Sequence, residues 1–580
     1  MVNIKKIFPF LTWLPNLDRQ GLSQDFIAGI TVALVLIPQS MAYADLAGLP
    51  AYYGLYAAFL PGAVAALFGS SRQLATGPVA VVSLLTASAL APLAATGSEG
   101  YIALAIALSL MVGIVQITLG ALRLGVVVNF LSHPVIVGFT NAAALIIGLS
   151  QLSKILGVKM GRSEHFVVDI WGVLQQVGKA HLPSVAFGIV AFAIMMTLKK
   201  KYPKLPNVLV AVSLTTLVSW LLDFQGMGGK VVGTIPQGLP SLAIPRINGD
   251  MFMTLLANAV IISLVGFMEA ISIAKAMAAR TKTSLDPNQE LIGQGLANLA
   301  GSLSQAYPTS GSFSRSAVNI NAGATSGASS LFTSLTVLIT LLFLTPLLYN
   351  LPEAVLAAVI MMAVVGLVNF KAIIHAWRAS RHDGIAAVAT FIATLGFAPH
   401  LDDGILLGAG LSILFFLYRT MQPRVASLGR YEDGTLRDLA VHPHLPDDER
   451  IIVIRFDGQL YFANVAYFED KLLASLETKP KAKYLLVVGD GINQLDASGE
   501  EVIRHLLERL QEHGMQLVFS GLKRQVLSVM RNTGLFDLLG GDTNIFSTDD
   551  IALTAIYQRI GDPGTPCPLM PVLKQKFQVA

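Results

Sequence analysis

Two ionisable side chains stand in stretches of this chain that are otherwise apolar. Arg315 lies in PTSGSFSRS at 308–316, and Glu269 lies in LVGFMEAIS at 264–272. A charge inside a membrane segment costs roughly 3 kcal/mol or more on insertion scales, so it is functional by default. Arg315 is suited to attract an anion, directly or through its field, or to brace packed helices. Glu269 is suited to relay protons or to pair with Arg315 or Lys275.

Two interrupted apolar segments must position such charges. They are TGPVAVVS at 76–83 and PTSGSFSRS at 308–316, and in each a helix-breaking stretch precedes a new helical run. Lipid tolerates broken backbone only where the backbone is buried in protein or lines a wet cavity. Two ordinary kinks in bundle helices are the alternative, but a matched pair in two halves of a chain favours a transporter binding site.

The composition indicates a membrane protein. The chain has 580 residues, of which 53% are hydrophobic and 13% charged, whereas soluble domains average about 25% charged. The single cysteine, Cys567, excludes an internal disulfide and a cysteine-based metal site. We find no metal-ligand cluster, no phosphate-binding GxxxxGK[ST] loop and no basic excess that would indicate nucleic acid. We therefore expect no cofactor and no enzymatic activity.

The apolar part divides into fourteen candidate membrane segments, since a bilayer core needs about 20 apolar residues per helix. The third and the tenth are too short to span alone, and they are the interrupted ones. An odd number of segments per half inverts the second half, which predicts a seven-plus-seven inverted repeat. The segments are 26–44, 52–69, 78–92, 101–121, 130–150, 184–198, 205–222, 252–275, 290–303, 312–325, 328–350, 352–369, 384–399 and 404–420.

Charged residues in the loops predict the orientation. With a cytoplasmic N-terminus, the inner loops hold most of the lysines and arginines, including Arg72, Arg123 and Lys199–Lys204. The loop with Lys154, Lys159 and Arg162 is an exception. The positive-inside rule then places both termini in the cytoplasm. The cluster Lys199–Lys204 is expected to be a topological anchor.

The composition changes near Met421, after which charge and hydrophobic alternation resemble a soluble domain. We expect a transmembrane domain at 1–425, a cytoplasmic domain at 440–562 and a tail at 563–580. Alternating strands and helices in the second domain predict a small α/β sheet. The expected elements are strands at 451–456, 484–488 and 515–520 and helices at 465–476, 498–512 and 524–531.

With this topology the two half-helices start near the middle of the membrane and point in opposite directions. Pro78 is suited to the start of the first, and Ser310 and Ser312 are suited to cap the second. Each N-terminus presents free N–H groups and about half a positive charge. Two opposed N-termini therefore predict an anion site.

Several motifs closely resemble the sulfate permease (SulP) family of anion transporters. They are PQSMAYA at 38–44, LAGLP at 46–50, YGLY at 53–56, TGP at 76–78 and SRS at 314–316. The C-terminal part resembles the STAS domain of the same family. The resemblance implies a seven-plus-seven repeat with core and gate subdomains, an elevator-like transport cycle and usually a homodimer.

The resemblance also implies a substrate site. The expected substrate-binding residues are Gln39, Tyr43, Val79, Ala80, Ser314 and Arg315. Val79 and Ala80 would offer backbone amides. Gln39 and Tyr43 are four residues apart and so share one helix face, where their polar tips can donate hydrogen bonds to an oxyanion. A satisfied polar pair in bundle packing is the alternative.

The expected function is sulfate transport by proton symport. An acidic residue at position 269 resembles the proton-coupled sulfate carriers, whereas some bicarbonate members use a similar site for sodium. Two helix N-termini supply about one positive charge, Arg315 adds one, and ionised Glu269 removes one. A dianion would then favour protonation of Glu269. The alternatives are a sodium-coupled bicarbonate transporter, a C4-dicarboxylate transporter and a passive anion channel.

The remaining expectations concern regulation, partners and location. The sequence DASG at 496–499 resembles the Asp-Ser-Ser-Gly phosphorylation loop of STAS-type proteins, but Ala497 replaces one serine. Ser498 is therefore either a regulatory site or a helix cap. We expect an inner-membrane protein whose partners are membrane lipid, an inorganic anion, a proton or sodium, a second copy of the chain and a cytosolic partner of the STAS domain.

Overall fold

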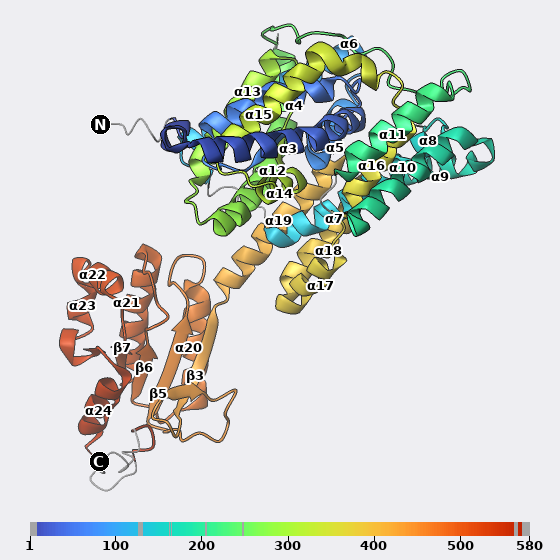
Figure 1. The fold of residues 1–580 in the computed structure, drawn as a ribbon. Helices are drawn as coiled ribbons and strands as arrows, with labels where there is room; N and C mark the ends of the chain where they lie inside the picture. The colour runs from blue at the N-terminus through green and yellow to red at the C-terminus, as the bar shows by residue number, and fades with distance from the viewer. Residues whose placement is uncertain are drawn as a thin grey trace. The chain divides into compact units, whose positions relative to one another are not determined.

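The computed structural model describes residues 8–125, 132–161, 163, 165–202, 206–245, 249–561 and 567–570. The chain forms two compact units, Met1–Ile413 and Leu414–Ala580, here called the membrane unit and the C-terminal unit (Figure 1). Arg162, Lys204 and most of the expected tail at 563–580 lie outside the described residues. The domain boundaries at 425, 440 and 562 stay a prediction.

Each of the fourteen expected segments coincides with a helix, of which the last, α19, extends past the end of the membrane unit, and the expected fold class is confirmed. The eleventh of these helices, α15, is followed directly by a π-helical turn, η4 (Thr340–Leu344), and a 3-10 turn, η5 (Thr345–Leu348). The matching helices are α3 (Arg19–Leu46), α4 (Tyr53–Phe68), α5 (Ala80–Leu90), α6 (Glu99–Ala121), α7 (His133–Ser150), α10 (Leu182–Lys201), α11 (Asn207–Leu221), α12 (Gly249–Thr281), α13 (Pro287–Leu303), α14 (Phe313–Asn321), α15 (Ala328–Ile339), α16 (Glu353–Val365), α18 (Arg381–Phe397) and α19 (Leu401–Met421).

The membrane unit also contains short helices that the sequence did not predict. They are α2 (Phe10–Trp13), α8 (Leu152–Leu156), α9 (Phe166–Gln175) and α17 (Phe370–Ala379). These helices are too short to span a bilayer, so the hydrophobic-length criterion does not detect them. Within the described ranges, eight helices are long and apolar enough to cross a membrane.

The helices form two bundles with reciprocal packing. In the core bundle, defined here as α3–α6 and α12–α15, α3 packs against α14 and α15, while α12 packs against α5 and α6. Likewise, α4 packs against α15, while α13 packs against α6. Exchanging each helix for its counterpart seven segments later reproduces the same contacts, as an inverted repeat requires.

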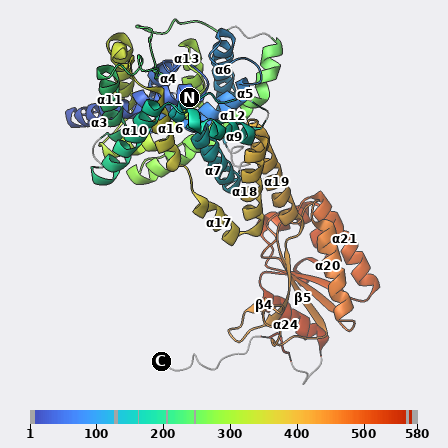
Figure 2. The same ribbon diagram turned by 90° about the vertical axis from the view of Figure 1, so that its right-hand side faces the viewer.

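The second set of helices, α7, α10, α11, α16 and α18, is called the gate bundle. Here α7 packs against α18, and α10 packs against α11 and α16. Figures 1 and 2 show α10, α11 and α16 side by side. The gate bundle meets the core bundle where α3 and α5 contact α16.

Close packing of α3 on α4 depends on Gly54. A Cβ atom added at this position would lie closer than 3.0 Å to the backbone of Ser40 and Met41, which cannot move like a flexible side chain. We expect Gly54→Ala to destabilise the protein by about 3 kcal/mol, because overpacking forces backbone shifts. The measurement is the thermal unfolding midpoint of the detergent-purified protein.

Gly410→Ala is the matched control for Gly54→Ala. Gly410 also lies in a helix, α19, and an added Cβ there would meet no atom within 4 Å. Its unfolding midpoint should stay the same or rise slightly, since alanine favours helix by about 1 kcal/mol over glycine. Equal midpoints for the two variants would contradict the packing role of Gly54.

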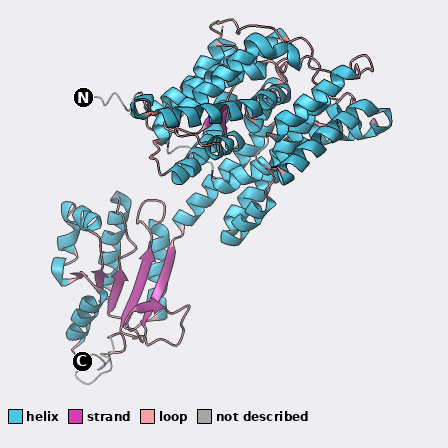
Figure 3. Ribbon diagram, viewed as in Figure 1, coloured by secondary structure: helices cyan, strands magenta, loops and turns pink. Residues whose placement is uncertain are grey.

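The C-terminal unit is a six-stranded sheet with helices on both faces. The strand order is β4-β3-β5-β6-β7-β8, with parallel pairing from β5 to β8 and antiparallel pairing of β3 with both β4 and β5. The strands are β3 (Arg424–Arg430), β4 (Leu436–Asp438), β5 (Ile451–Asp457), β6 (Tyr484–Val488), β7 (Gln516–Ser520) and β8 (Ile545–Phe546). Figure 3 shows them in magenta.

One face of this sheet packs against α20 (Val465–Thr478), α21 (Ala497–Glu512) and α22 (Arg524–Asn532), through buried residues such as Leu472, Leu506 and Met530. The other face packs against α24 (Asp549–Ile560) and Leu569. The predicted strands and helices agree with the structure to within two residues. The sequence missed β3, β4, β8, α24 and the short α23 (Leu535–Leu538).

Candidate functional site

Two short paired strands stand at the centre of the membrane unit. β1 (Ala75–Gly77) pairs antiparallel with β2 (Ser310–Ser312), with Thr76 opposite Gly311. Figure 3 shows this small sheet among the helices. β1 leads into the half-helix α5 and β2 into the half-helix α14, so both interrupted segments are confirmed. Because the strands are antiparallel, the half-helices leave in opposite directions.

Side chains of α13 hold β1 and the residue that precedes β2. The Gln294 Nε2 donates to Thr76 Oγ1 at 2.8 Å, while Asn298 Oδ1 accepts from the Thr309 amide at 2.7 Å. Asn298 Nδ2 also donates to the Thr309 carbonyl at 3.1 Å. The sequence analysis missed these residues. Their signal is the spacing of two amide side chains four residues apart on an apolar segment.

The predicted side-chain caps of the half-helices are not observed, although Ser312 does take the predicted N-cap position. Ser312 occupies the N-cap position of α14 but forms no side-chain cap hydrogen bond in the described structure, and Ser310 Oγ donates to the Gly266 carbonyl at 2.7 Å. Pro78 precedes the N-cap residue Val79 rather than standing in the first turn of α5. In the described structure the first N–H groups of both half-helices therefore lack side-chain acceptors.

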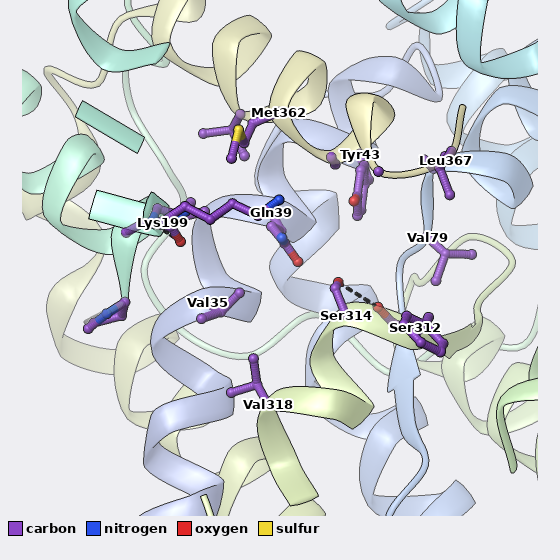
Figure 4. Close-up of a pocket in the computed structure, with 18 of the residues that line it drawn as sticks. Val35, Gln39, Tyr43, Val79, Lys199, Ser312, Ser314, Val318, Met362 and Leu367 are labelled. Carbon is purple, nitrogen blue, oxygen red and sulfur yellow. Dashed lines mark hydrogen bonds between the residues drawn. The ribbon is translucent and has the colours of Figure 1, made fainter. Parts of the chain in front are cut away.

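A cavity of about 490 Å³ borders both half-helix N-termini (Figure 4). The core bundle contributes residues of α3, α5, α12 and α14 to its lining, and the gate bundle contributes residues of α10, α11 and α16. Of the predicted substrate-binding and ion-coupling residues, the cavity brings together Gln39, Tyr43, Val79, Ala80, Ser314 and Glu269. Arg315 is the predicted site residue that does not line it.

Gln39 and Tyr43 enter the cavity from the same face of α3, and both are largely buried. The Gln39 Oε1 is buried and has no hydrogen-bond partner in the described structure. The alternative of a polar pair satisfied by bundle packing therefore fails for the Gln39 oxygen. Ser314 is exposed to the cavity, and its hydroxyl lies 3.4 Å from that of Ser312 (Figure 4).

Arg315 is fully buried beside β1. Its exposed fraction is 0%, and its Nε, Nη1 and Nη2 atoms have no hydrogen-bond partner among the described residues. A Cβ added at Gly77 would lie 3.4 Å from Nη2, an ordinary van der Waals contact, so the guanidinium group lies directly beside β1. The structural brace considered for Arg315 would require a bonded partner. An unpaired buried cation instead projects positive field into its surroundings.

Glu269 lines the cavity from α12, and its Oε2 atom is buried without a hydrogen-bond partner in the described structure. It is close enough to Arg315 and Tyr43 for electrostatic interaction. Pairing by hydrogen bonds with Arg315 is not observed, since all three Arg315 nitrogens are unpartnered. Lys275, the other proposed partner, is exposed.

The structure adds residues that the sequence analysis missed. Tyr307 is 1% exposed, and its hydroxyl lies 3.2 Å from Ser83 Oγ. Lys199, predicted only as part of a topological anchor, lines the cavity. The position of a lysine in a basic cluster gives no signal for this role. Among the described residues, no group of three potential ligands could hold a metal ion.

The predicted helix cap in the C-terminal unit is also corrected. Asp496 rather than Ser498 caps α21, because its carboxylate accepts from the Gly499 amide at 2.8 Å. The same carboxylate accepts from the Phe462 amide at 2.9 Å. An aspartate is as good an N-cap as a serine. Ser498 lies in the first turn of α21 and is partly buried.

Paired half-helices whose N-termini border a cavity, beside an unpaired buried cation, define a multi-pass membrane transporter of anions. The sequence comparison agrees. Residues 22–390 match the model of the sulfate permease family, and residues 442–552 match that of the STAS domain. The chain belongs to the sulfate permease family, which is a family of transporters and not of enzymes.

Curated relatives cover nearly the whole chain. The chain is 37% identical to the chloroplastic sulfate transporter 4.1 of Arabidopsis thaliana over 93% of its own length and 81% of that protein. It is 32% identical to high affinity sulfate transporter 2 of Stylosanthes hamata over 96% of its own length and 87% of that protein.

Solved structures show the same fold. Murine solute carrier 26 family member A9, an anion transporter, superposes with a TM-score of 0.88 at 24% identity, covering 96% of this chain and 94% of that one. The transmembrane domain of the cyanobacterial bicarbonate transporter BicA superposes with a TM-score of 0.58 at 24% identity, covering 68% of this chain and 98% of that one.

Proposed function

We propose that this protein is a secondary active transporter that carries sulfate by proton symport. The observation that carries the proposal is the fully buried Arg315, which has no partner among the described residues and lies beside the strands that lead into two half-helices. A buried unpaired cation is costly, and an anion bound in the adjacent cavity would offset that cost. The curated relatives named above are described as sulfate transporters.

The charges around the cavity support coupling to a proton. Two half-helix N-termini contribute about one positive charge together. Arg315 adds one and ionised Glu269 removes one, which leaves about one net positive charge for these groups. A sulfate dianion bound beside Glu269 would bring like charges together in a desolvated site and so favour the protonated carboxyl group. Binding of sulfate and binding of a proton would therefore strengthen each other.

We propose a role for each residue of this site. Gln39 and Tyr43 would donate hydrogen bonds from α3. Val79 and Ala80 at the start of α5, and Ser314 in the first turn of α14, would offer backbone or hydroxyl donors. Arg315 would act through its field, because it does not line the cavity.

The division into bundles supports an elevator-like cycle. All proposed binding residues and Glu269 lie on the core bundle, while α10, α11 and α16 of the gate bundle close the other side of the cavity. Movement of the core bundle against the gate bundle would therefore carry the whole site. We further infer a homodimer in the inner membrane with both termini in the cytoplasm, from the loop charges and the family resemblance.

Transport by purified protein in liposomes tests this proposal. Labelled sulfate, bicarbonate and succinate are supplied at two pH values, with and without a proton or sodium gradient. We expect sulfate accumulation that requires an inward proton gradient. Sodium-driven bicarbonate uptake, succinate uptake, or downhill flux that no gradient can drive into accumulation would each contradict the proposal.

We propose that the STAS domain binds a cytosolic partner and that Ser498 is a regulatory site. A phosphate on Ser498 would lie in the first turn of α21, where the helix N-terminus favours negative charge. Deleting the residues after Gln422 separates transport from regulation. We expect the shortened protein to transport sulfate. Loss of transport with normal folding would assign the domain to the transport cycle itself.

A further inference from the structure

Lys199 brings a full positive charge to the lining of the cavity, in addition to the field of the buried Arg315. It lies in the last turn of α10, and its side chain points into the cavity (Figure 4). Of the described residues that line the cavity, Lys199 and Glu269 are the ones with ionic side chains. Lys199 is exposed, as are Lys200 and Lys201, which follow it directly in the chain, but neither of the latter two is part of this lining.

Lys199 belongs to the gate bundle. α10 packs against α11 and α16, and Asn207 and Val208 at the start of α11 line the same cavity. The cavity therefore extends from the half-helix N-termini to the end of α10 that precedes the α10–α11 connection. An anion that entered beside the C-terminal end of α10 would meet Lys199 before Gln39, Tyr43 and Ser314.

We propose that Lys199 captures the substrate and selects divalent over monovalent oxyanions on this side of the membrane; this inference rests on the proposed function. A cleft lined by one sign of charge with low-dielectric walls concentrates counter-ions. Coulomb attraction to a lysine is twice as large for a dianion as for a monoanion at the same distance. The loss of Lys199 would therefore weaken sulfate binding more than bicarbonate binding.

Because Lys199 belongs to the gate bundle, we expect its effect on sulfate binding to differ between the two sides of the membrane. Gln39, Tyr43, Glu269 and Ser314 move with the core bundle in an elevator cycle, whereas Lys199 stays with the gate bundle. Lys199 would then act on the site while the cavity is open toward the α10–α11 connection. Replacement should raise the half-saturating sulfate concentration on that side and leave the opposite side nearly unchanged.

The test compares Lys199→Gln with Lys199→Arg and with Lys200→Gln, a matched control that removes the same charge one residue away. Dissociation constants for sulfate and bicarbonate are measured calorimetrically on purified protein at low and high ionic strength. Half-saturating concentrations from each side are measured in oriented liposomes. For Lys199→Gln we expect an about ten-fold increase in the sulfate dissociation constant at low salt and an about three-fold increase for bicarbonate.

The expected increase for Lys199→Gln shrinks at high salt. Lys199→Arg and Lys200→Gln should bind both anions like the wild type. An equal effect of Lys200→Gln, an unchanged sulfate constant, or equal effects on both anions would overturn the role of Lys199. If the wild-type protein binds sulfate without transporting it, the proposed function is overturned. The role of Lys199 is then decided by the dissociation constants alone. Wild-type protein that binds neither anion would overturn both.

Discussion

Replacing Arg315 by glutamine should weaken sulfate binding by about 100-fold and abolish uptake at low sulfate. Removing one member of a desolvated charge pair costs about 2–5 kcal/mol, and every 1.4 kcal/mol is a factor of about ten. The effect should be this large because Arg315 is 0% exposed and makes no hydrogen bond within the described structure. The measurements are sulfate uptake in liposomes and sulfate binding to purified protein.

Two further variants separate anion attraction from a structural brace. Arg315→Lys keeps the charge and should retain part of the sulfate affinity. Lys275→Gln removes an exposed cation from α12 and should bind sulfate normally. Thermal unfolding without sulfate distinguishes the two roles. If Arg315→Gln lowers the unfolding midpoint sharply while the folded fraction binds sulfate normally, Arg315 is a brace.

Replacing Glu269 by glutamine should uncouple sulfate transport from the proton gradient. The amide cannot take up a proton when the dianion binds, so an inward proton gradient should no longer drive accumulation. Exchange of sulfate across the membrane should persist, because the half-helix N-termini and Arg315 are unchanged. The measurement is the sulfate accumulation ratio at steady state, with and without the gradient.

Glu290→Gln is the matched control for this prediction. Glu290 is also a buried carboxylate of the membrane unit, 1% exposed, but it accepts hydrogen bonds from the amides of Ser70 and Ser71. Its replacement should lower stability and leave gradient-driven accumulation intact. Gradient-driven accumulation that persists in Glu269→Gln, or that is lost only in Glu290→Gln, would contradict the coupling role of Glu269.

The membrane segments and the two breaks were predictable because their signals are local. A run of apolar residues has the length of a bilayer wherever it stands in the chain, and Thr76-Gly77-Pro78 interrupts a helix through its own backbone preferences. The same applies to β5, β6 and β7, whose apolar runs are bounded by polar residues. The edge strand β4 and the two-residue β8 were missed because they are too short to show a pattern.

The residue types that line the cavity were predictable, whereas the directions of their side chains were not. Gln39 and Tyr43 share a helix face through their four-residue spacing, and both do line the cavity. Ser314 and Arg315 are adjacent in the chain, but the side chain of Ser314 lies in the cavity and that of Arg315 lies beside β1. The pairing of Ala75 with Ser312 sets the orientation of α14, and these residues are 237 positions apart in the chain.

The amino-acid sequence alone was enough to establish the membrane class, the two interrupted helices and the charges near them, since hydrophobic length, backbone preference and charge are properties of neighbouring residues. Packing between distant segments decided which groups lack partners and which reach the cavity. Gln294 and Asn298 bind Thr76 and Thr309 from the two halves, and Lys199 reaches the cavity because α10 packs against α16. Such contacts arise only when the segments come together in the folded chain.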